Sequence, residues 1–209
     1  MRRITKAAVS GFAGCALILG VSQAANSDSG NMTYLLEKAP IGDFQEDPGP
    51  FDGAKGTLRV SQAPDDTATG FKLTVDGIDE AAAGQEFGAH LHTGPCVNED
   101  YANPDIGKAA GSLAGPHYKH GVAPSLEEVE VWFDFIPNDH GVATDDTKKN
   151  FVPVDSSLNP GEMSIVIHVL PTNTEFGVPT AGQPVGYAGA RQACFRLLTP
   201  DWVPKPAIG

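Results

Sequence analysis

The stretch VEVWFDFI, residues 129–136, decides the fold class. Alternate side chains of a strand share a face, so Val129, Val131, Phe133 and Phe135 would lie together against a core. Residues 164–170 (SIVIHVL) are apolar almost throughout, as expected of a second buried strand. No segment has the pattern of a helix longer than one or two turns, so the sequence predicts an all-β protein.

Weaker strand and turn patterns are found in other parts of the sequence. Further strand candidates are residues 32–36, 56–62, 70–75 and 89–92. The Asp65-Asp66 turn predicts a hairpin, and residues 138–141 predict a second hairpin turn leading into Val142 and Ala143. Two long segments without periodicity, residues 93–128 and 171–189, are predicted as loops, and loops of this length in a compact domain usually carry function.

Length and charge restrict the domain count and the partners. The 209 residues suit one domain, which we place at residues 26–209. The formal net charge is −12, with 14 Lys and Arg against 26 Asp and Glu, which argues against nucleic-acid partners and against a basic membrane-binding surface. The sequence is compatible with a homodimer but does not require one.

The N-terminus is typical of a signal peptide spanning residues 1–25. Basic Arg2, Arg3 and Lys6 precede an apolar run at 7–21 and small residues at 22–25. We therefore expect an exported protein, whether periplasmic, secreted or in the cell envelope. Cys15 lies in a sequence loosely similar to a lipoprotein box, but inside the apolar run, so a soluble form is favoured over a lipid-anchored one.

The histidines are the residues that indicate a possible chemical function. His90 and His92 are two residues apart on a predicted strand and would face the same side, although such a pair alone is often only a solvated polar face. His117 lies in the first long loop, and His168 lies in the apolar strand, where a lone histidine is usually a buried neutral imidazole. Together they suggest one site, and an all-imidazole set suits copper or zinc.

The segments around these histidines resemble those of the copper-zinc superoxide dismutase family. Residues 88–92 (GAHLH) resemble its copper motif, and residues 115–117 (GPH) resemble the segment with its bridging histidine. Residues 164–169 are similar to the strand of the last copper ligand, and residues 186–194 to the C-terminal signature of glycines, an arginine and a disulfide cysteine. The segments follow the family order from about residue 85 to 197, and residues 32–84 fit more loosely.

The resemblance implies a Greek-key β-sandwich or flattened barrel with two long functional loops. It implies four copper ligands, namely His90, His92, His117 and His168, with His117 in the bridging position. Cys96 would pair with Cys194. Arg191 would hold superoxide beside the copper, and His117 would release the copper on reduction and deliver a proton, so that superoxide is converted to dioxygen and hydrogen peroxide.

The resemblance is incomplete at the zinc subsite. After His117 the loop offers only His120, Glu127 and Glu128, and the aspartate expected after the last copper ligand is absent from residues 170–173 (LPTN). His140 belongs to a hairpin turn and is interpreted as solvated. We therefore expect a copper-only site, with His120 and Glu127 or Glu128 supporting His117 in place of zinc.

Two further interpretations stay open. The same fold could store or buffer copper with little turnover, or the site could be vestigial in a structural sandwich. Arg191 favours the enzyme, because a storage site does not need a cation to hold an anion. The second long loop has one charged residue in 171–184, Glu175, so Arg191 is the candidate for attracting superoxide.

Overall fold

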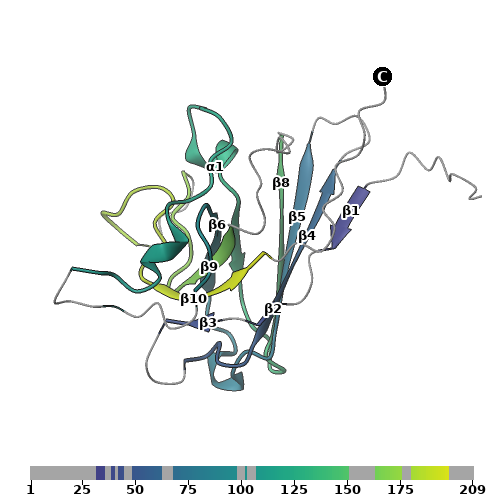
Figure 1. Ribbon diagram of the computed structural model, residues 1–209, viewed down its shortest axis with the longest axis vertical. Coiled ribbons are helices and arrows are strands. Elements are labelled where there is room, and N and C mark those ends of the chain that lie inside the picture. The colour runs from purple at the N-terminus through teal and green to yellow at the C-terminus, as the bar shows by residue number, and fades with distance from the viewer. Residues whose placement is uncertain are drawn as a thin grey trace, which may run out of the picture.

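Two antiparallel sheets pack face to face (Figure 1). The structure is a computed structural model; it describes residues 32–35, 39–40, 42–44, 49–62, 68–97, 102, 107–150, 163–175 and 180–197. The predicted all-β sandwich is confirmed. The predicted signal peptide, Cys15 and the Asp65-Asp66 turn lie outside the described residues. Within them, no helix is long and apolar enough to cross a membrane.

The first sheet has the strand order β1-β4-β5-β8, with β2 also paired to β4. Its strands are β1 (Met32–Leu35), β2 (Ala39–Pro40), β4 (Lys55–Gln62), β5 (Thr69–Asp76) and β8 (Val142–Lys149). The β4–β5 pairing confirms the predicted hairpin. β8 was predicted only as Val142 and Ala143; its remaining residues are mostly polar because it is an end strand with a solvent-facing side.

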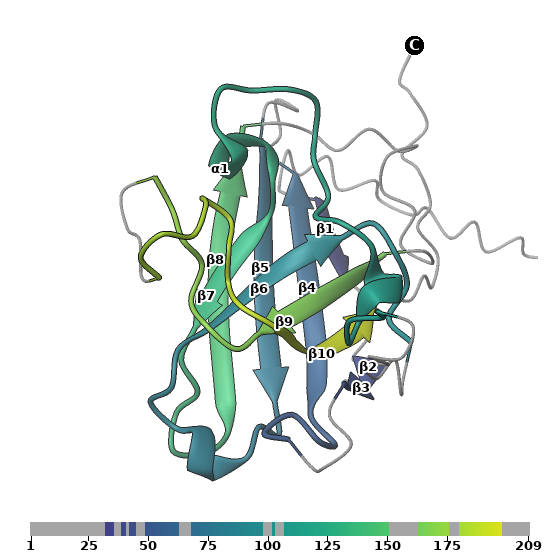
Figure 2. The same cartoon turned by 90° about the vertical axis from the view of Figure 1, so that its left-hand side faces the viewer.

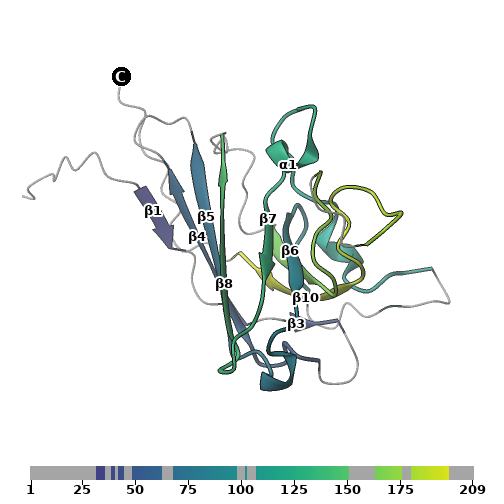
Figure 3. The ribbon, with the colours of Figure 1, turned by 180° about the vertical axis from the view of Figure 1, so that it is seen from behind.

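The second sheet has the order β3-β10-β9-β6-β7. Its strands are β3 (Gly42–Asp43), β6 (Phe87–His92), β7 (Trp132–Phe135), β9 (Ser164–His168) and β10 (Arg191–Arg196). Figure 3 shows β7 and β8 side by side where the two sheets approach each other, joined by the predicted turn at residues 138–141.

The strand predicted at residues 129–136 is shorter than expected. Residues Leu126–Val129 form a single helical turn, α1, so Val129 is buried but is not part of the strand. The Ser125 hydroxyl accepts a hydrogen bond from the Glu127 amide, which caps this turn. Val131, Phe133 and Phe135 do pack in the core as predicted.

The second sheet is buried on both faces, and this arrangement creates the site. On β6, Phe87, Ala89 and Leu91 point into the core between the sheets. His90 and His92 alternate with them and point to the opposite face, yet they are also buried. The two long loops lie over that outer face (Figure 2). The sheet therefore carries an apolar core on one side and a polar cluster under the loops on the other.

Candidate metal centre

Four histidines converge under the loops. His90 and His92 come from β6, His168 from the end of β9, and His117 from the first long loop, which forms a bridge to β6 at His92. One ring nitrogen of each lies within 4.8 Å of those of the other three. The structure thus brings together the four residues that the sequence predicted as ligands.

Backbone carbonyls set the orientation of two rings. His92 Nδ1 lies 2.9 Å from the carbonyl oxygen of Gly115, and His168 Nδ1 lies 3.1 Å from that of Gly189. A carbonyl only accepts, so we assign the proton of each ring to Nδ1, which leaves a lone pair on Nε2. Both Nε2 atoms are buried and have no hydrogen-bond partner in the described part of the chain.

The other two rings are fixed by side chains. His117 Nδ1 lies 2.7 Å from Glu130 Oε2, so this ring donates to the carboxylate and turns its Nε2 towards the cluster. That Nε2 is 2.9 Å from His90 Nδ1. The Nε2 of His90 points the other way and lies 2.9 Å from Thr172 Oγ1.

This donor set fits a transition-metal ion. Buried polar atoms normally find partners, so two unpartnered imidazole nitrogens aimed at one point indicate a missing electrophile. Four imidazoles without thiolate or carboxylate suit copper or zinc better than calcium or magnesium. The rings of His92, His117 and His168 each donate a hydrogen bond from Nδ1 to a carbonyl or carboxylate oxygen, as metal-binding histidines usually do with the nitrogen that does not bind the metal.

Burial keeps three of the rings neutral. It lowers the pKa of His92 to about 2 and that of His168 to about 4, and the neighbouring histidines and Arg191 also lower both values. The pKa of His90 is likewise well below its usual range, through burial first and the adjacent rings second. Neutral imidazole is the form that binds a metal.

These shifts make the metal-free protein sensitive to acid. The pKa of each ring is lower in the folded state, so each contributes stability above its unfolded pKa near 6.5 that is lost as the pH falls towards its folded pKa. Near pH 5 we expect a loss of about 2 kcal/mol for each of His92 and His168 relative to pH 7. Asp134 and Asp145, whose pKa values are raised by burial, partly oppose this trend.

Urea unfolding of metal-free protein at the two pH values measures the effect. His168→Gln should reduce the loss by about one ring's share, about 2 kcal/mol, whereas His140→Gln, on an exposed turn, should leave it unchanged. Equal free energies of unfolding at pH 7 and pH 5 would contradict the assignment of buried neutral rings.

Glu130 is a site residue that the sequence reasoning missed. Its side chain is 2% exposed and accepts from His117 Nδ1 and from Trp132 Nε1, each at 2.7 Å, while Lys119 Nζ lies 3.2 Å from its other oxygen. Burial alone would raise the pKa of Glu130, but hydrogen bonds from His117, Trp132 and Lys119 hold it below its usual value. Glu130 and Trp132 alternate with Val131, and this period of two could have placed them on the histidine side.

The predicted zinc substitutes lie elsewhere. His120, Glu127 and Glu128 line a separate hollow of 710 Å³ beside the end of β8, and His120 Nδ1 contacts the Tyr118 hydroxyl at 3.3 Å. The expectation that one of these glutamates supports His117 is corrected, because Glu130 makes that contact. His140 is exposed on its hairpin turn, as predicted.

Arg191 is tied to the first long loop, which carries His117. Its guanidinium donates to the carbonyl oxygens of Gly111 and Gly115, both at 2.6 Å, at the two ends of a short 3₁₀ turn over Ser112–Ala114. The Gly115 carbonyl also accepts from His92. One oxygen atom thus links the arginine to a predicted metal ligand, and the charge of Arg191 lowers the pKa of the buried rings.

The predicted disulfide is confirmed. Cys96 and Cys194 are bonded across 98 residues, joining the first long loop to β10 three residues after Arg191. They pack with Phe44, Ala114 and Val166 in a small apolar cluster between the loop and the sheet. The disulfide therefore fixes the loop that carries His117 and the acceptors of Arg191.

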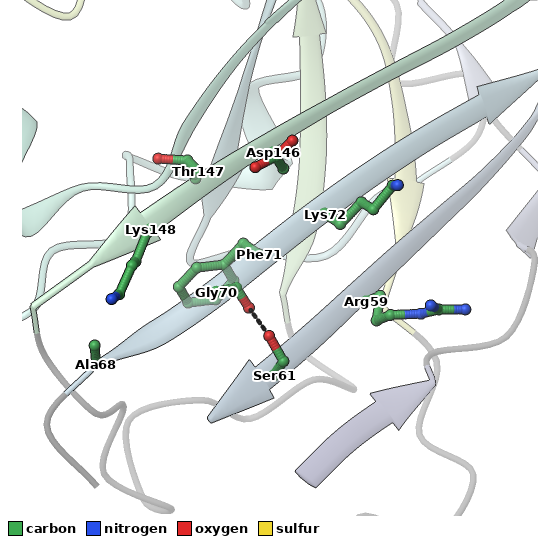
Figure 4. A pocket seen from close by; sticks show the side chains of 9 residues that line it. All are labelled: Arg59, Ser61, Ala68, Gly70, Phe71, Lys72, Asp146, Thr147 and Lys148. Carbon is green, nitrogen blue, oxygen red and sulfur yellow. Dashed lines mark hydrogen bonds between the residues drawn. The ribbon is translucent and has the colours of Figure 1, made fainter. Parts of the chain in front are cut away.

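A second hollow lies on the first sheet. It has a volume of 510 Å³ and is formed by β4, β5 and β8 around Gly70, with Arg59, Lys72 and Lys148 at its margins (Figure 4). Those strands belong to the sheet that does not carry the histidines. This hollow therefore adds nothing to the cluster.

The fold and the site define a disulfide-bonded β-sandwich with a four-histidine cluster able to hold a metal ion. No protein-family model and no curated protein matches the chain. Among solved structures, the clock protein EA4 is similar, with a TM-score of 0.46 and 15% identity over 77% of this chain and 93% of that chain.

Proposed function

We propose that the protein is a copper-dependent superoxide dismutase. The observation that carries the proposal is the convergence of four imidazole nitrogens next to an arginine that is anchored to the loop of His117. The resemblance of residues 85–197 to copper-zinc superoxide dismutases agrees with this arrangement. When bound, copper would supply one-electron redox chemistry, accepting an electron from one superoxide and returning it to a second.

The chain's own residues have distinct parts in this reaction. His90, His92 and His168 would hold the ion, since their rings are buried and fixed. His117 is 22% exposed, more than the other three, and its Nδ1 is bonded to Glu130. This exposure supports His117 as the residue that delivers a proton to the reduced product.

Glu130 supports a site with copper and little zinc. A bridging histidine would present its second nitrogen to zinc, but here His117 Nδ1 donates to a buried carboxylate already held by Trp132 and Lys119. The four-histidine group is the one metal-binding cluster found among the described residues. Glu130 thus fixes His117 as a second metal would.

We expect the purified protein, reconstituted with both ions, to retain about one copper per chain and little zinc. Metal analysis after dialysis measures this, together with a superoxide assay. Zinc retained at a level near that of copper, and lost on His120→Ala, would show that the loop builds a zinc site after all. Copper bound without activity would leave copper storage as the function.

Arg191 is proposed to attract superoxide. The protein carries a net charge of −12, so its overall field repels an anion, and a fixed local cation must offset this. Hydrogen bonds to the carbonyl oxygens of Gly111 and Gly115 hold the guanidinium in place. The half-buried side chain lies on β10 opposite His168.

Arg191→Ala should bind copper yet lower the superoxide rate constant roughly tenfold and flatten its dependence on salt. Arg191→Lys should recover part of the rate, because a point charge still attracts the anion. Arg196→Ala, an exposed arginine at the far end of β10, is the matched control and should change little. Full activity of Arg191→Ala at low salt would refute this part of the account.

Export remains part of the proposal. The Cys96–Cys194 disulfide agrees with an oxidising compartment, where disulfides persist. The basic and apolar N-terminal residues agree with this destination.

A further inference from the structure

Lys149 is a buried cation that the proposed reaction does not use. It follows Lys148 at the end of β8, and the two side chains differ: Lys148 is exposed, whereas Lys149 is only 7% exposed. A lysine is almost never buried unless its ammonium group is paired. Burial lowers the pKa of Lys149, while the charges of Glu127 and Glu130 oppose that shift. The neighbours of Lys149 therefore have to compensate a buried charge.

Two contacts hold the ammonium group. Its Nζ donates to the carbonyl oxygen of Glu127 in α1 at 2.6 Å, and α1 lies beside this end of β8 (Figure 2). The same Nζ lies 5.9 Å from the centroid of the Trp132 ring, a distance at which an indole attracts a cation. Because Trp132 begins β7, Lys149 connects the first sheet with the second.

Trp132 in turn holds the carboxylate of Glu130. Its Nε1–H donates to Glu130 Oε2 at 2.7 Å, and this oxygen also accepts from His117 Nδ1. The backbone of Glu130 is fixed separately, since its N–H donates to the Leu126 carbonyl at the end of α1. A chain of contacts therefore runs from Lys149 through Trp132 and Glu130 to a predicted metal ligand.

The Trp132 ring is enclosed on other sides as well. It is 6% exposed, and its centroid lies 5.9 Å from that of His90. Gly186 of the second loop has a φ of +83°, and a Cβ there would lie 3.1 Å from the indole, so the loop backbone packs closely against this ring. The position of the indole is thus set by groups from β6, β8 and the second loop.

Lys149 acts on Glu130 by position rather than by pairing with it. Within the described ranges, the ammonium group that pairs with this carboxylate is that of Lys119, whose Nζ lies 3.2 Å from Oε1. The hydrogen bond to Glu127 instead keeps the Lys149 ammonium near the Trp132 ring.

We propose that Lys149 is a positioning residue for His117, which acts through Trp132 to hold the Glu130 carboxylate against His117 Nδ1–H. This contact fixes the ring whose Nε2 faces the cluster. The inference rests on the proposed metal site but not on dismutation. Lys149 itself would touch neither the ion nor the substrate.

The test uses full-length metal-free protein and Cu(II) alone. Proton magnetic resonance measures how fast His117 Nδ1–H exchanges with water, and competition with a chelator gives the Cu(II) affinity. Lys149→Met keeps the length of the side chain but removes its charge. It should speed the exchange by at least about tenfold and weaken Cu(II) binding by about tenfold. Its urea midpoint should not fall, because the cost of burying a charge is also removed.

A double-mutant cycle tests the route through Trp132. Trp132→Phe removes the N–H that donates to Glu130 and should itself speed the exchange of His117 Nδ1–H. If Lys149 acts through Trp132, adding Lys149→Met in this background should change the exchange by less than about threefold.

Two further variants separate this role from a general effect of charge. Lys148→Met removes the exposed neighbouring charge and should match wild type in every measurement. Lys149→Arg keeps a cation that can lie over the indole and should stay within about threefold of wild type in exchange and affinity.

Three results would overturn the inference: a folded Lys149→Met with unchanged exchange and Cu(II) affinity within about twofold, an equally large effect of Lys149→Met in the Trp132→Phe background, or a folded Lys149→Arg that behaves like the methionine variant. If Lys149→Met does not fold, the arginine variant and wild type decide, and a wild-type His117 Nδ1–H that exchanges as fast as that of free histidine would also overturn it. Because the exchange is measured without metal, a protein that passes it but fails to bind copper or remove superoxide would contradict only the proposed function.

Discussion

We expect His168→Ala to lower the Cu(II) affinity by at least about a hundredfold and to remove superoxide dismutation. Within the described ranges, His168 supplies one of the two buried side-chain nitrogens that have no hydrogen-bond partner, so its removal would delete a ligand rather than a support. The remaining three rings also lose a close neighbour, since His90 and His168 have ring centroids 4.7 Å apart. Chelator competition measures the affinity, and the same samples are assayed for activity.

Controls separate ligand loss from structural damage. His168→Gln keeps a polar side chain of similar length and should also lose tight copper binding, while its sandwich remains folded by circular dichroism. His140→Ala removes an exposed histidine from the hairpin turn and should bind copper like wild type. Undiminished affinity in folded His168→Ala would show that copper, if it binds, binds elsewhere.

Reduction of the Cys96–Cys194 disulfide should lower the free energy of unfolding by about 4 to 5 kcal/mol in the loop-closure model, because the bond closes a loop across 98 residues. This is a change of more than about a thousandfold in the folding equilibrium. The reduced protein should also lose activity, since the disulfide ties the first long loop to β10 beside Arg191.

Urea unfolding of oxidised and reduced wild type compares the same side chains with and without the bond. The double variant Cys96→Ala/Cys194→Ala, which cannot re-form the bond during the measurement, should show at least the same loss. A loss below about 1 kcal/mol in reduced protein would mean that the bond contributes little beyond the packing of its apolar cluster.

The fold was predictable where side chains alternate between a core and another environment. In residues 56–62, Leu58 and Val60 pack in the core while Arg59 is exposed, which is the pattern that the sequence displays. The pattern failed in β8, since an end strand with a solvated face needs few apolar residues. It also failed at Val129, where the Ser125 cap stabilises a helical turn that strand periodicity does not reveal.

The site was predictable to the extent that its ligands lie in recognisable motifs. The four histidines, Arg191 and the two cysteines were all identified from sequence, and the structure brings the histidines together. Glu130 was missed because its contact with the loop histidine His117 is set by tertiary structure. The period of two would place Glu130 on the histidine side of the sheet, but it does not reveal which loop residue meets it there.

The proposed function requires that the four-histidine site turn over superoxide with bound copper. Superoxide decay should be followed by pulse radiolysis in the presence of protein loaded with increasing fractions of copper, alongside His168→Ala treated in the same way. We expect a rate that rises in proportion to bound copper and is lost in His168→Ala. Wild type with copper bound that removes superoxide no faster than this variant would contradict it.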